Sequence, residues 1–438
     1  SMTWYNDKAG LILLDFAAAF PSLAHKWILM VLKAMGILAR VYLAFQELYH
    51  DCKVEWVFGT VHNLMFTVTA GIKQGCPASG SLFAIALDPF LRMLCLRMPG
   101  PISIVSAFAD DIGIVTRQIL HGLTILAEFL ALLKAATAMG LSPTKSIIIP
   151  LGRQTADSIS SYIQEHHPSL GGLLIRTHGK YLGFMIGPSA DEARWDITAA
   201  KFWQRGMAAR DAGGVFFHNV LHYSFYATSV LSYLMQFSLL PKTVLRMEAR
   251  ILQYLTHGPW NAMPSGCLLA LCDVGFPKEP ASLVEANVAA MLRAAIASKA
   301  FAAAAALLEH QPTDPSALLA PRLLPWISTI AVFQMRENLV LFRSRFPNFL
   351  MEPHATVQGR AIATLRASRK SPWDELLRRR ALRWFPEGAP NAVEHMHCNL
   401  VAACQHLPPR VVFSTLRLIT NGVSTARRYQ QAPLDCHL

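Results

Sequence analysis

The sequence predicts an α+β protein, because two kinds of pattern follow each other along the chain. Residues 1 to about 190 alternate short apolar runs of strand length with longer stretches of helical apolar spacing. From about residue 191 onward the spacing is helical. A hydrophobic fraction of 53% with only 16% charged residues indicates packed domains and excludes a disordered chain. At 438 residues the chain exceeds one core, so two or three domains are expected.

Two of the strand-like runs end in carboxylates. Asp15 directly follows the apolar run 11–14, and Asp110 and Asp111 follow the run 102–109. If the two runs are neighbouring strands of one sheet, their carboxylates converge at the strand ends. Oxygen ligands of this kind suit hard divalent cations. Each site has a plain alternative when taken singly, because Asp15 could cap a helix and the other two could lie in a polar turn.

A glycine-rich block between them, GIKQGCPASGSLF at residues 71–83, predicts a strand that turns into a helix. Gly75 and Pro77 supply the turn, and Ser79 is a candidate helix cap. Residues 82–93 then have helical apolar spacing. Gln74 is expected at the end of the strand.

Three blocks follow one another along the chain: LLDFAAAF at 13–20, the glycine-rich block at 71–83 and FADD at 108–111. Together they resemble motifs A, B and C of reverse transcriptases, and the middle block is most similar to the non-LTR (LINE-type) retrotransposon enzymes. The resemblance implies a right-handed palm polymerase fold with an antiparallel sheet. It also implies RNA-directed DNA polymerase activity, an in-line phosphoryl transfer assisted by two Mg²⁺ ions, with Mn²⁺ as an alternative.

The same resemblance assigns roles to individual residues. Asp15, Asp110 and Asp111 would be catalytic and would bind the metal together with the backbone carbonyl of Phe16. Gln74 and Gly75 would face the sugar and base of the incoming nucleotide.

Phe20 would lie under that sugar, where its ring would collide with a ribose 2′-hydroxyl and favour DNA precursors. A core phenylalanine is the alternative at this position.

Two shorter blocks follow. GLSPTKS at 140–146 resembles motif D, whose Lys145 would lie near the triphosphate and protonate the leaving pyrophosphate. Ser142 stands where the family usually has asparagine, and a solvated loop lysine is the alternative. KYLGF at 180–184 resembles motif E, the primer grip, and places Tyr181, Leu182 and Gly183 at the primer end. A plain β-turn with a buried tyrosine is the alternative there.

The domain organisation expected from these anchors has three parts. Residues 1–190 would form the palm with part of the fingers, 191–310 a helical thumb-like region, and 311–438 a basic helical carboxyl-terminal region. Helices are expected at 195–210, 216–240, 242–255 and 281–308. Residues 212–241 carry no charge and are long enough to span a bilayer, but their histidine, asparagine and tyrosine residues favour a protein helix. No membrane association is therefore expected.

The net charge of +12 favours a polyanionic partner, and the resemblance specifies an RNA template, a DNA primer and deoxynucleoside triphosphates. A second basic zone, 360–383, interleaves arginines with Trp373, and Trp384 follows it. Arginine with tryptophan can contact phosphates and stack on bases, whereas a solvated helix face is the alternative. The predicted nucleic-acid contacts are Arg369, Lys370, Arg378, Arg379, Arg380 and Arg383.

The eight cysteines show no disulfide framework, which favours an intracellular setting, in the nucleus or cytoplasm as a retroelement ribonucleoprotein. The histidines and cysteines between 395 and 406 lack a Cys-x-x-Cys pair, so zinc is not expected there. The oligomeric state is left open by the sequence.

The resemblance also predicts that neighbouring parts lie outside this chain. Motif A begins almost at once, so upstream fingers segments and an endonuclease domain are expected elsewhere, and residues 435–438 resemble the opening of a zinc knuckle. Two other functions stay open. One is a group II intron maturase, although those relatives generally have glycine where Cys76 stands. The other is a non-catalytic nucleic-acid-binding remnant.

Overall fold

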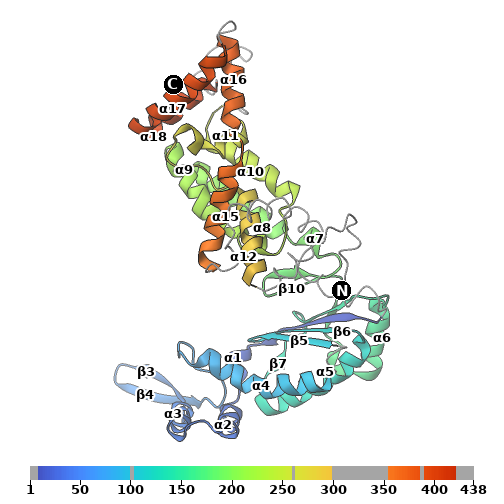
Figure 1. Cartoon of the computed structure of the whole chain (residues 1–438). Coiled ribbons are helices and arrows are strands. Elements are labelled where there is room, and N and C mark those ends of the chain that lie inside the picture. The colour runs from blue at the N-terminus through green and yellow to red at the C-terminus, as the bar shows by residue number, and fades with distance from the viewer. Residues whose placement is uncertain (1–7, 99–102, 259–261, 298–353, 385–388, 421–438) are drawn as a thin grey trace, which may run out of the picture. The chain divides into compact units, whose positions relative to one another are not determined.

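The structure is a computed structural model that describes residues 8–98, 103–258, 262–297, 354–384 and 389–420. It divides into two compact units, Ser1–Arg194 and Trp195–Leu438 (Figure 1). The strands of the first unit are β1 (Gly10–Leu14), β2 (Phe16–Ala17), β3 (Lys53–Phe58), β4 (Val61–Thr67), β5 (Ser103–Phe108), β6 (Asp111–Thr116), β7 (Gly140–Leu141), β8 (Ile147–Pro150), β9 (Leu174–Ile175), β10 (Gly179–Tyr181) and β11 (Phe184–Ile186). Its helices are α1 (Ala19–Ser22), α2 (His25–Ala34), α3 (Ala39–Tyr49), α4 (Ser79–Arg97), α5 (Ile119–Thr137), α6 (Ala156–His166), the 3₁₀ turn η1 (Pro168–Leu170) and α7 (Ala190–Ala193).

A five-stranded sheet forms the centre of this unit, in the order β5-β6-β1-β8-β9. All its pairs are antiparallel except β8 with β9, so the sheet is mixed and not purely antiparallel as predicted. The two Asp-bearing runs, β1 and β5, are not neighbouring strands, so the condition under which their ends would converge directly is not met. β6 lies between β1 and β5, because the chain turns back tightly after β5 and the returning strand occupies the place next to β1.

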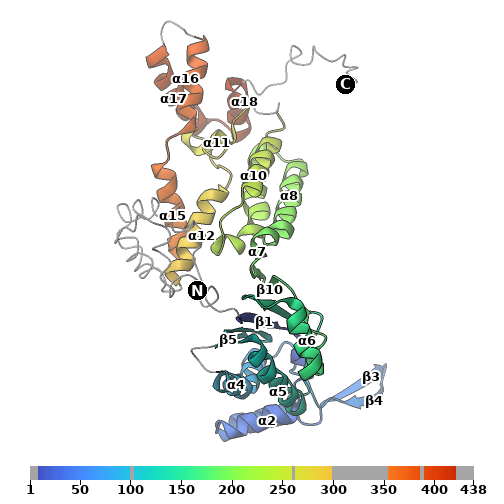
Figure 2. The same cartoon turned by 90° about the vertical axis from the view of Figure 1, so that its right-hand side faces the viewer.

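The central strand β1 is buried on both faces, which explains its continuous apolar run. Ile12 and Leu14 belong to the larger core, with residues of α4 and α5, and these two helices lie along one face of the sheet (Figure 1). Leu11 and Leu13 point the other way and join Ile149 in a smaller core. The β10–β11 hairpin covers that second face, as Figures 1 and 2 both show. Alternate side chains of a strand face opposite sides, so one run fills two cores.

Helices α4 and α5 are long and apolar enough to cross a membrane by length and composition alone. The same test is passed by core helices of soluble proteins, and both helices contribute side chains to the larger core. Their apolar character is therefore explained by packing on the sheet.

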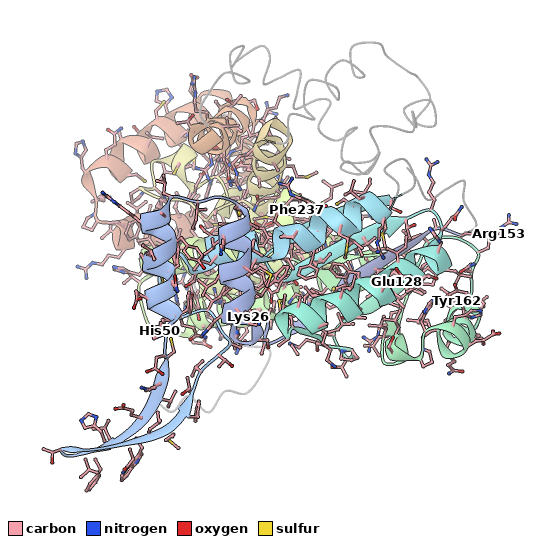
Figure 3. The ribbon with its side chains drawn as sticks, turned by 90° about the horizontal axis from the view of Figure 1, so that it is seen from below. Lys26, His50, Glu128, Arg153, Tyr162 and Phe237 are labelled. Carbon is pink, nitrogen blue, oxygen red and sulfur yellow. The ribbon has the colours of Figure 1, made fainter. Side chains whose placement is uncertain are left out.

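Strands β3 and β4 form a separate two-stranded ribbon that extends away from the sheet and helices (Figure 3). Every residue of β4 is exposed, and so are Trp56 and Phe58, whose rings stack with centroids 5.8 Å apart.

The second unit is helical. It contains α8 (Asp196–Asp211), α9 (Phe216–His222), the π turn η2 (Tyr223–Ala227), the 3₁₀ turns η3 (Thr228–Leu231) and η4 (Leu234–Gln236), α10 (Lys242–Leu255), α11 (Ser265–Leu268), η5 (Leu271–Val274), α12 (Leu283–Ala297), α15 (His354–Ser368), α16 (Pro372–Trp384), α17 (Ala389–His406) and α18 (Pro409–Ile419). Helix α12 packs along α15, and α16 packs against α17 (Figure 2). Segments on both sides of residue 310 thus share one unit, and the three-part division of the chain stays a prediction.

The predicted single helix 216–240 is interrupted. After α9 the backbone passes through a π turn and two 3₁₀ turns. The hydroxyl of Thr228 donates to the carbonyl of Ser224 at 2.6 Å, the kind of side-chain bond that competes with the helix ladder. Of the alanine-rich helix expected at 281–308, the structure describes α12, and residues 298–308 lie outside the described part of the chain.

A buried carboxyl group in this unit makes its stability depend on pH. Glu248 of α10 accepts the backbone N–H of Leu283 at 2.8 Å and the hydroxyl of Tyr223 at 3.4 Å. Burial raises the pKa of Glu248 to about 7. The native state therefore keeps a proton that the unfolded chain releases near its ordinary pKa of 4.5. This stabilising contribution is complete below pH 4.5 and is lost as the pH rises through about 7.

We accordingly expect the free energy of unfolding of the second unit to fall between pH 5 and pH 8. Glu248→Gln, which cannot ionise, should remove this part of the pH dependence, and urea unfolding at the two pH values measures it. An identical fall in the variant would assign the effect to other groups.

Candidate active site

Asp15 lies in a break between two strands, at the end of the sheet where β1 stops and β6 begins. This end of the sheet, with Asp15, Asp110 and Asp111, is called the carboxylate edge. β1 ends at Leu14 and β2 begins at Phe16. The last pair between β1 and β6 joins Leu14 to Ile112, and the same register continued by one residue would set Asp15 opposite Asp111. The charge of Asp15 also contributes to the raised pKa of Asp111. Side chains opposite each other in antiparallel strands are on the same face. The structure thus brings two of the predicted carboxylates together.

The third carboxylate, Asp110, lies in the two-residue turn that joins β5 to β6 and precedes Asp111 directly. Ala109, its partner in the turn, has φ 53°, a left-handed conformation that costs a non-glycine residue about 1 kcal/mol. Backbone strain of this kind gathers at functional sites.

The negative charges of Asp15, Asp110 and Asp111 at this end of the sheet favour binding of a cation. Burial raises the pKa of the Asp111 carboxyl, and the charges of Asp110 and Asp15 raise it further. Carboxylate oxygens are suitable ligands for a divalent metal ion, whose positive charge would favour the ionised form of Asp111. Within the residues that the structure describes, no three His, Cys, Asp or Glu side chains are close enough to form a complete ligand group on their own. The Phe16 side chain is buried, and the metal contact of its backbone carbonyl stays a prediction.

Motif D lies beside Asp15. β7 pairs with β2, joining Phe16 to Leu141, and this places the following turn next to the carboxylate. The Lys145 Nζ is 3.9 Å from Asp15 Oδ1, and the lysine side chain is 69% exposed. Lys145 therefore lies at the carboxylate edge and in solvent at the same time, and its role stays a prediction.

The glycine-rich loop before α4 differs from the prediction in two details. Gln74 and Gly75 lie in an exposed turn and not at a strand end, because β4 stops at Thr67. Gly75 has φ 84°, a value that glycine adopts easily. Ser79 does not cap the helix, since its hydroxyl donates to the carbonyl of Lys73 at 2.6 Å.

A histidine that the sequence pattern did not single out holds this loop. His25 is 7% exposed, and its Nε2 donates to the carbonyl of Gly71 at 2.8 Å. Backbone bonds from Gly71 to Leu23 and from Ile72 to Phe20 complete the connection between motif A and the loop. A cavity of about 720 Å³ opens beside them, lined by His25 and by loop residues including Gln74. A histidine five residues after an apolar motif carries no signal by itself, so only the fold could identify it.

Phe20 packs on the core and is still half-buried. Its ring stacks on that of Phe83 with centroids 4.3 Å apart. The structure is therefore compatible with both predicted roles, since one face of the ring contacts the core.

The hairpin predicted as the primer grip is present. Tyr181 pairs with Phe184, and Leu182 and Gly183 form the tip with φ of 48° and 83°. The Tyr181 hydroxyl donates to the carbonyl of Ser106 at 3.3 Å. Burial raises the pKa of Tyr181, and the charge of Asp111 raises it further. The hairpin is thus fixed beside the carboxylate edge, although its contact with a primer stays a prediction.

Only some side chains of the second basic zone, 360–383, are exposed on the surface. Arg369 donates to Glu279 at 3.0 Å, to Glu285 at 3.1 Å and to the carbonyl of Leu269 at 2.9 Å. Because Glu279 is 3% exposed, this is an internal ion-pair network. Arg369 is engaged inside the fold, which corrects its assignment as a nucleic-acid contact.

Trp373 is corrected for a similar reason. It is fully buried, and its Nε1 donates to the carbonyls of Cys267 and Ala270, so it cannot stack on bases. Arg380 donates to the carbonyl of Thr420, and Arg379 pairs with Glu375 on the surface.

Lys370 and Arg378 are exposed and remain candidates. The side chains of Arg383 and Trp384 lie outside the described set, as do residues 435–438. His397 of the unfavoured zinc group contacts the carbonyl of Asp273 and the carboxylate of Asp374.

Comparison with known proteins supports the assignment of the first unit. Residues 5–186 match the family of reverse transcriptases (RNA-dependent DNA polymerases). A transposon TX1 uncharacterized 149 kDa protein of Xenopus laevis is 30% identical over 115 residues, which is 24% of this chain and 9% of that protein. The first unit is therefore a reverse transcriptase domain, the class that the three motifs predicted, and such domains have the palm polymerase fold.

Proposed function

We propose that this chain is the RNA-directed DNA polymerase of a non-LTR retroelement and extends a DNA primer on an RNA template. The observation that carries the proposal is that Asp15 directly follows β1 and that Asp110 and Asp111 lie at the turn into the neighbouring strand β6, inside the matched residues. The charges of Asp15 and Asp110 both act on Asp111. The similarity to a transposon protein supports the retroelement origin.

The proposed chemistry is nucleotidyl transfer assisted by two Mg²⁺ or Mn²⁺ ions. Asp15, Asp110 and Asp111 would hold them with the backbone carbonyl of Phe16. When bound, the ions stabilise the charge on the attacking and leaving oxygens. The raised pKa of Asp111, to which the charges of Asp110 and Asp15 contribute, supports the assignment, because a cation would offset that repulsion.

The other residues of the edge bind and orient substrates in this proposal. Gln74 and Gly75 face the sugar and base of the deoxynucleotide, and the hairpin tip holds the primer end. Lys145 lies beside Asp15, from where its Nζ can deliver a proton to the leaving pyrophosphate. Lys370 and Arg378 contact phosphates. We further propose that the protein acts inside the cell as a ribonucleoprotein, without a membrane.

A primer-extension assay tests this function. The chain should extend a DNA primer annealed to RNA when Mg²⁺ or Mn²⁺ is present. It should also bind primer–template with an affinity that falls steeply as salt increases, because lysine and arginine release counterions from phosphate. Binding without extension under either metal would favour a non-catalytic nucleic-acid-binding remnant instead.

Phe20→Ala is expected to relax selection against ribonucleotides. Removal of the ring would leave room for a 2′-hydroxyl, so incorporation of ribonucleotides relative to deoxynucleotides should rise by about tenfold or more. Competition between the two triphosphates in a single-turnover assay measures this ratio.

Phe83→Leu provides the control, because it disturbs the core stack from its buried side and should leave sugar selection unchanged. If the Phe20 variant still extends DNA with parental selectivity, Phe20 serves only the core.

A further inference from the structure

The backbone at Asp15 is held by a residue to which neither the motifs nor the family match assigns a role. Asp15 lies between two ladders, since β1 pairs with β8 up to Leu13↔Ile147 and β2 pairs with β7 from Phe16↔Leu141. In the segment that runs from β1 to β2, two residues lie between the ladders, Leu14 and Asp15. In the segment that runs from β7 to β8, five residues lie between them, 142–146. Regular strand pairing cannot continue across such a mismatch, so the peptide groups of Asp15 need other partners.

Ser146 supplies one of these partners with its side chain. The N–H of Asp15 donates to Ser146 Oγ at 3.0 Å, and the same hydroxyl lies 3.3 Å from the carbonyl oxygen of Asp15, to which it can donate. That carbonyl also accepts the N–H of Ser142 at 2.8 Å. A hydroxyl has one proton to donate and lone pairs to accept, so one side chain can bridge both peptide groups of the same residue.

The bridge is itself fixed. Ser146 has no exposed surface, and its N–H donates to the carbonyl of Ser142 at 3.0 Å. Its own carbonyl accepts the N–H of Leu174 at 3.1 Å, which ties it to the parallel strand β9. Because Ser146 itself is fully buried, water is poorly placed to replace its hydroxyl, and loss of the hydroxyl would leave the N–H of Asp15 unpaired.

We propose that Ser146 is a positioning residue of the polymerase site. It fixes the backbone of Asp15 at the break between β1 and β2 and so sets the direction of the Asp15 carboxylate toward Asp111. The metal-related part of this inference rests on the proposed function. Removing a hydrogen-bond partner of a metal-binding residue commonly lowers metal affinity or activity by about 10- to 100-fold.

The test uses Ser146→Ala, which removes the bridge, and Ser146→Thr, which keeps a hydroxyl. Ser103→Ala is the matched control, because Ser103 is also a buried serine of this sheet and donates to Thr116 Oγ1 at 3.0 Å, at the opposite end from the carboxylates. Three quantities are measured on the full chain: hydrogen exchange of the Asp15 amide, the affinity for Mn²⁺ without nucleotide, and the Mg²⁺ concentration that gives half-maximal extension.

Ser146→Ala should speed exchange of the Asp15 amide and weaken Mn²⁺ binding by about 10- to 100-fold, with a matching rise in the Mg²⁺ requirement. The threonine variant should lie close to the parent. Ser103→Ala should lower stability without changing any of the three.

Parental amide exchange and Mn²⁺ affinity in Ser146→Ala would overturn the inference, even if the parent extends primers. Equal changes in the Ser103 variant would also overturn it, since they would indicate a general loss of stability. A parent that extends no primer would contradict the polymerase function, while amide exchange would still decide whether Ser146 holds Asp15.

Discussion

Asp110→Asn is expected to reduce primer extension on the order of a thousandfold or more, while primer–template binding stays close to the parental value. The substitution keeps the size of the side chain and removes the negative charge at the turn between β5 and β6. That charge belongs to the group that raises the pKa of Asp111 and would hold the metal ions. The groups proposed to contact nucleic acid are elsewhere in the chain, so affinity should survive. Single-turnover extension and equilibrium binding on the same protein measure the two effects separately.

Asp157→Asn is the matched control, because Asp157 is an exposed carboxylate in the first turn of α6. It should leave both extension and binding unchanged. Parallel loss of extension and binding in the Asp110 variant would indicate misfolding of the sheet edge. Parental extension would remove Asp110 from the catalytic set.

Arg369→Ala is expected to destabilise the second unit by about 3–5 kcal/mol, as when one partner of a buried ion pair is removed. Its guanidinium lies among Asp273, Glu279 and Glu285, and Glu279 is almost completely buried. Without Arg369, Glu279 and Glu285 keep their pairs with Arg366, whereas Asp273 loses its contact with the Arg369 guanidinium. Chemical denaturation should show a lower midpoint, whereas nucleic-acid affinity of the remaining folded protein should be parental.

Lys370→Ala makes the comparison direct, since it changes the charge by the same amount at the next residue, which is exposed. It should leave stability within about 0.5 kcal/mol of the parent and weaken nucleic-acid binding slightly. If the Arg369 variant keeps parental stability but binds nucleic acid more weakly, the original assignment of Arg369 as a phosphate contact would be restored.

The sequence by itself determined the class of the first unit and the identity of its acidic residues. Apolar runs of strand length bounded by turn residues can be recognised locally, which is why β1, β5 and the helix after the glycine-rich loop were found where they were expected. Three short motifs in a fixed order then identified a reverse transcriptase domain, as the family match confirms. The helical character of the second unit was also predictable, since it depends on residues three and four apart.

Only the tertiary structure decided which of these residues meet. The strand beside β1 is β6, which begins at Asp111, and not β5, which precedes Asp110. Ser146 reaches Asp15 across 131 residues of chain, and Arg369 reaches Glu279 across 90. A serine, or an arginine in a basic stretch, looks the same locally whether it is solvated or paired inside the fold. Strand register and long-range packing distinguish the two, because they alone determine which polar groups lose water and must find partners within the protein.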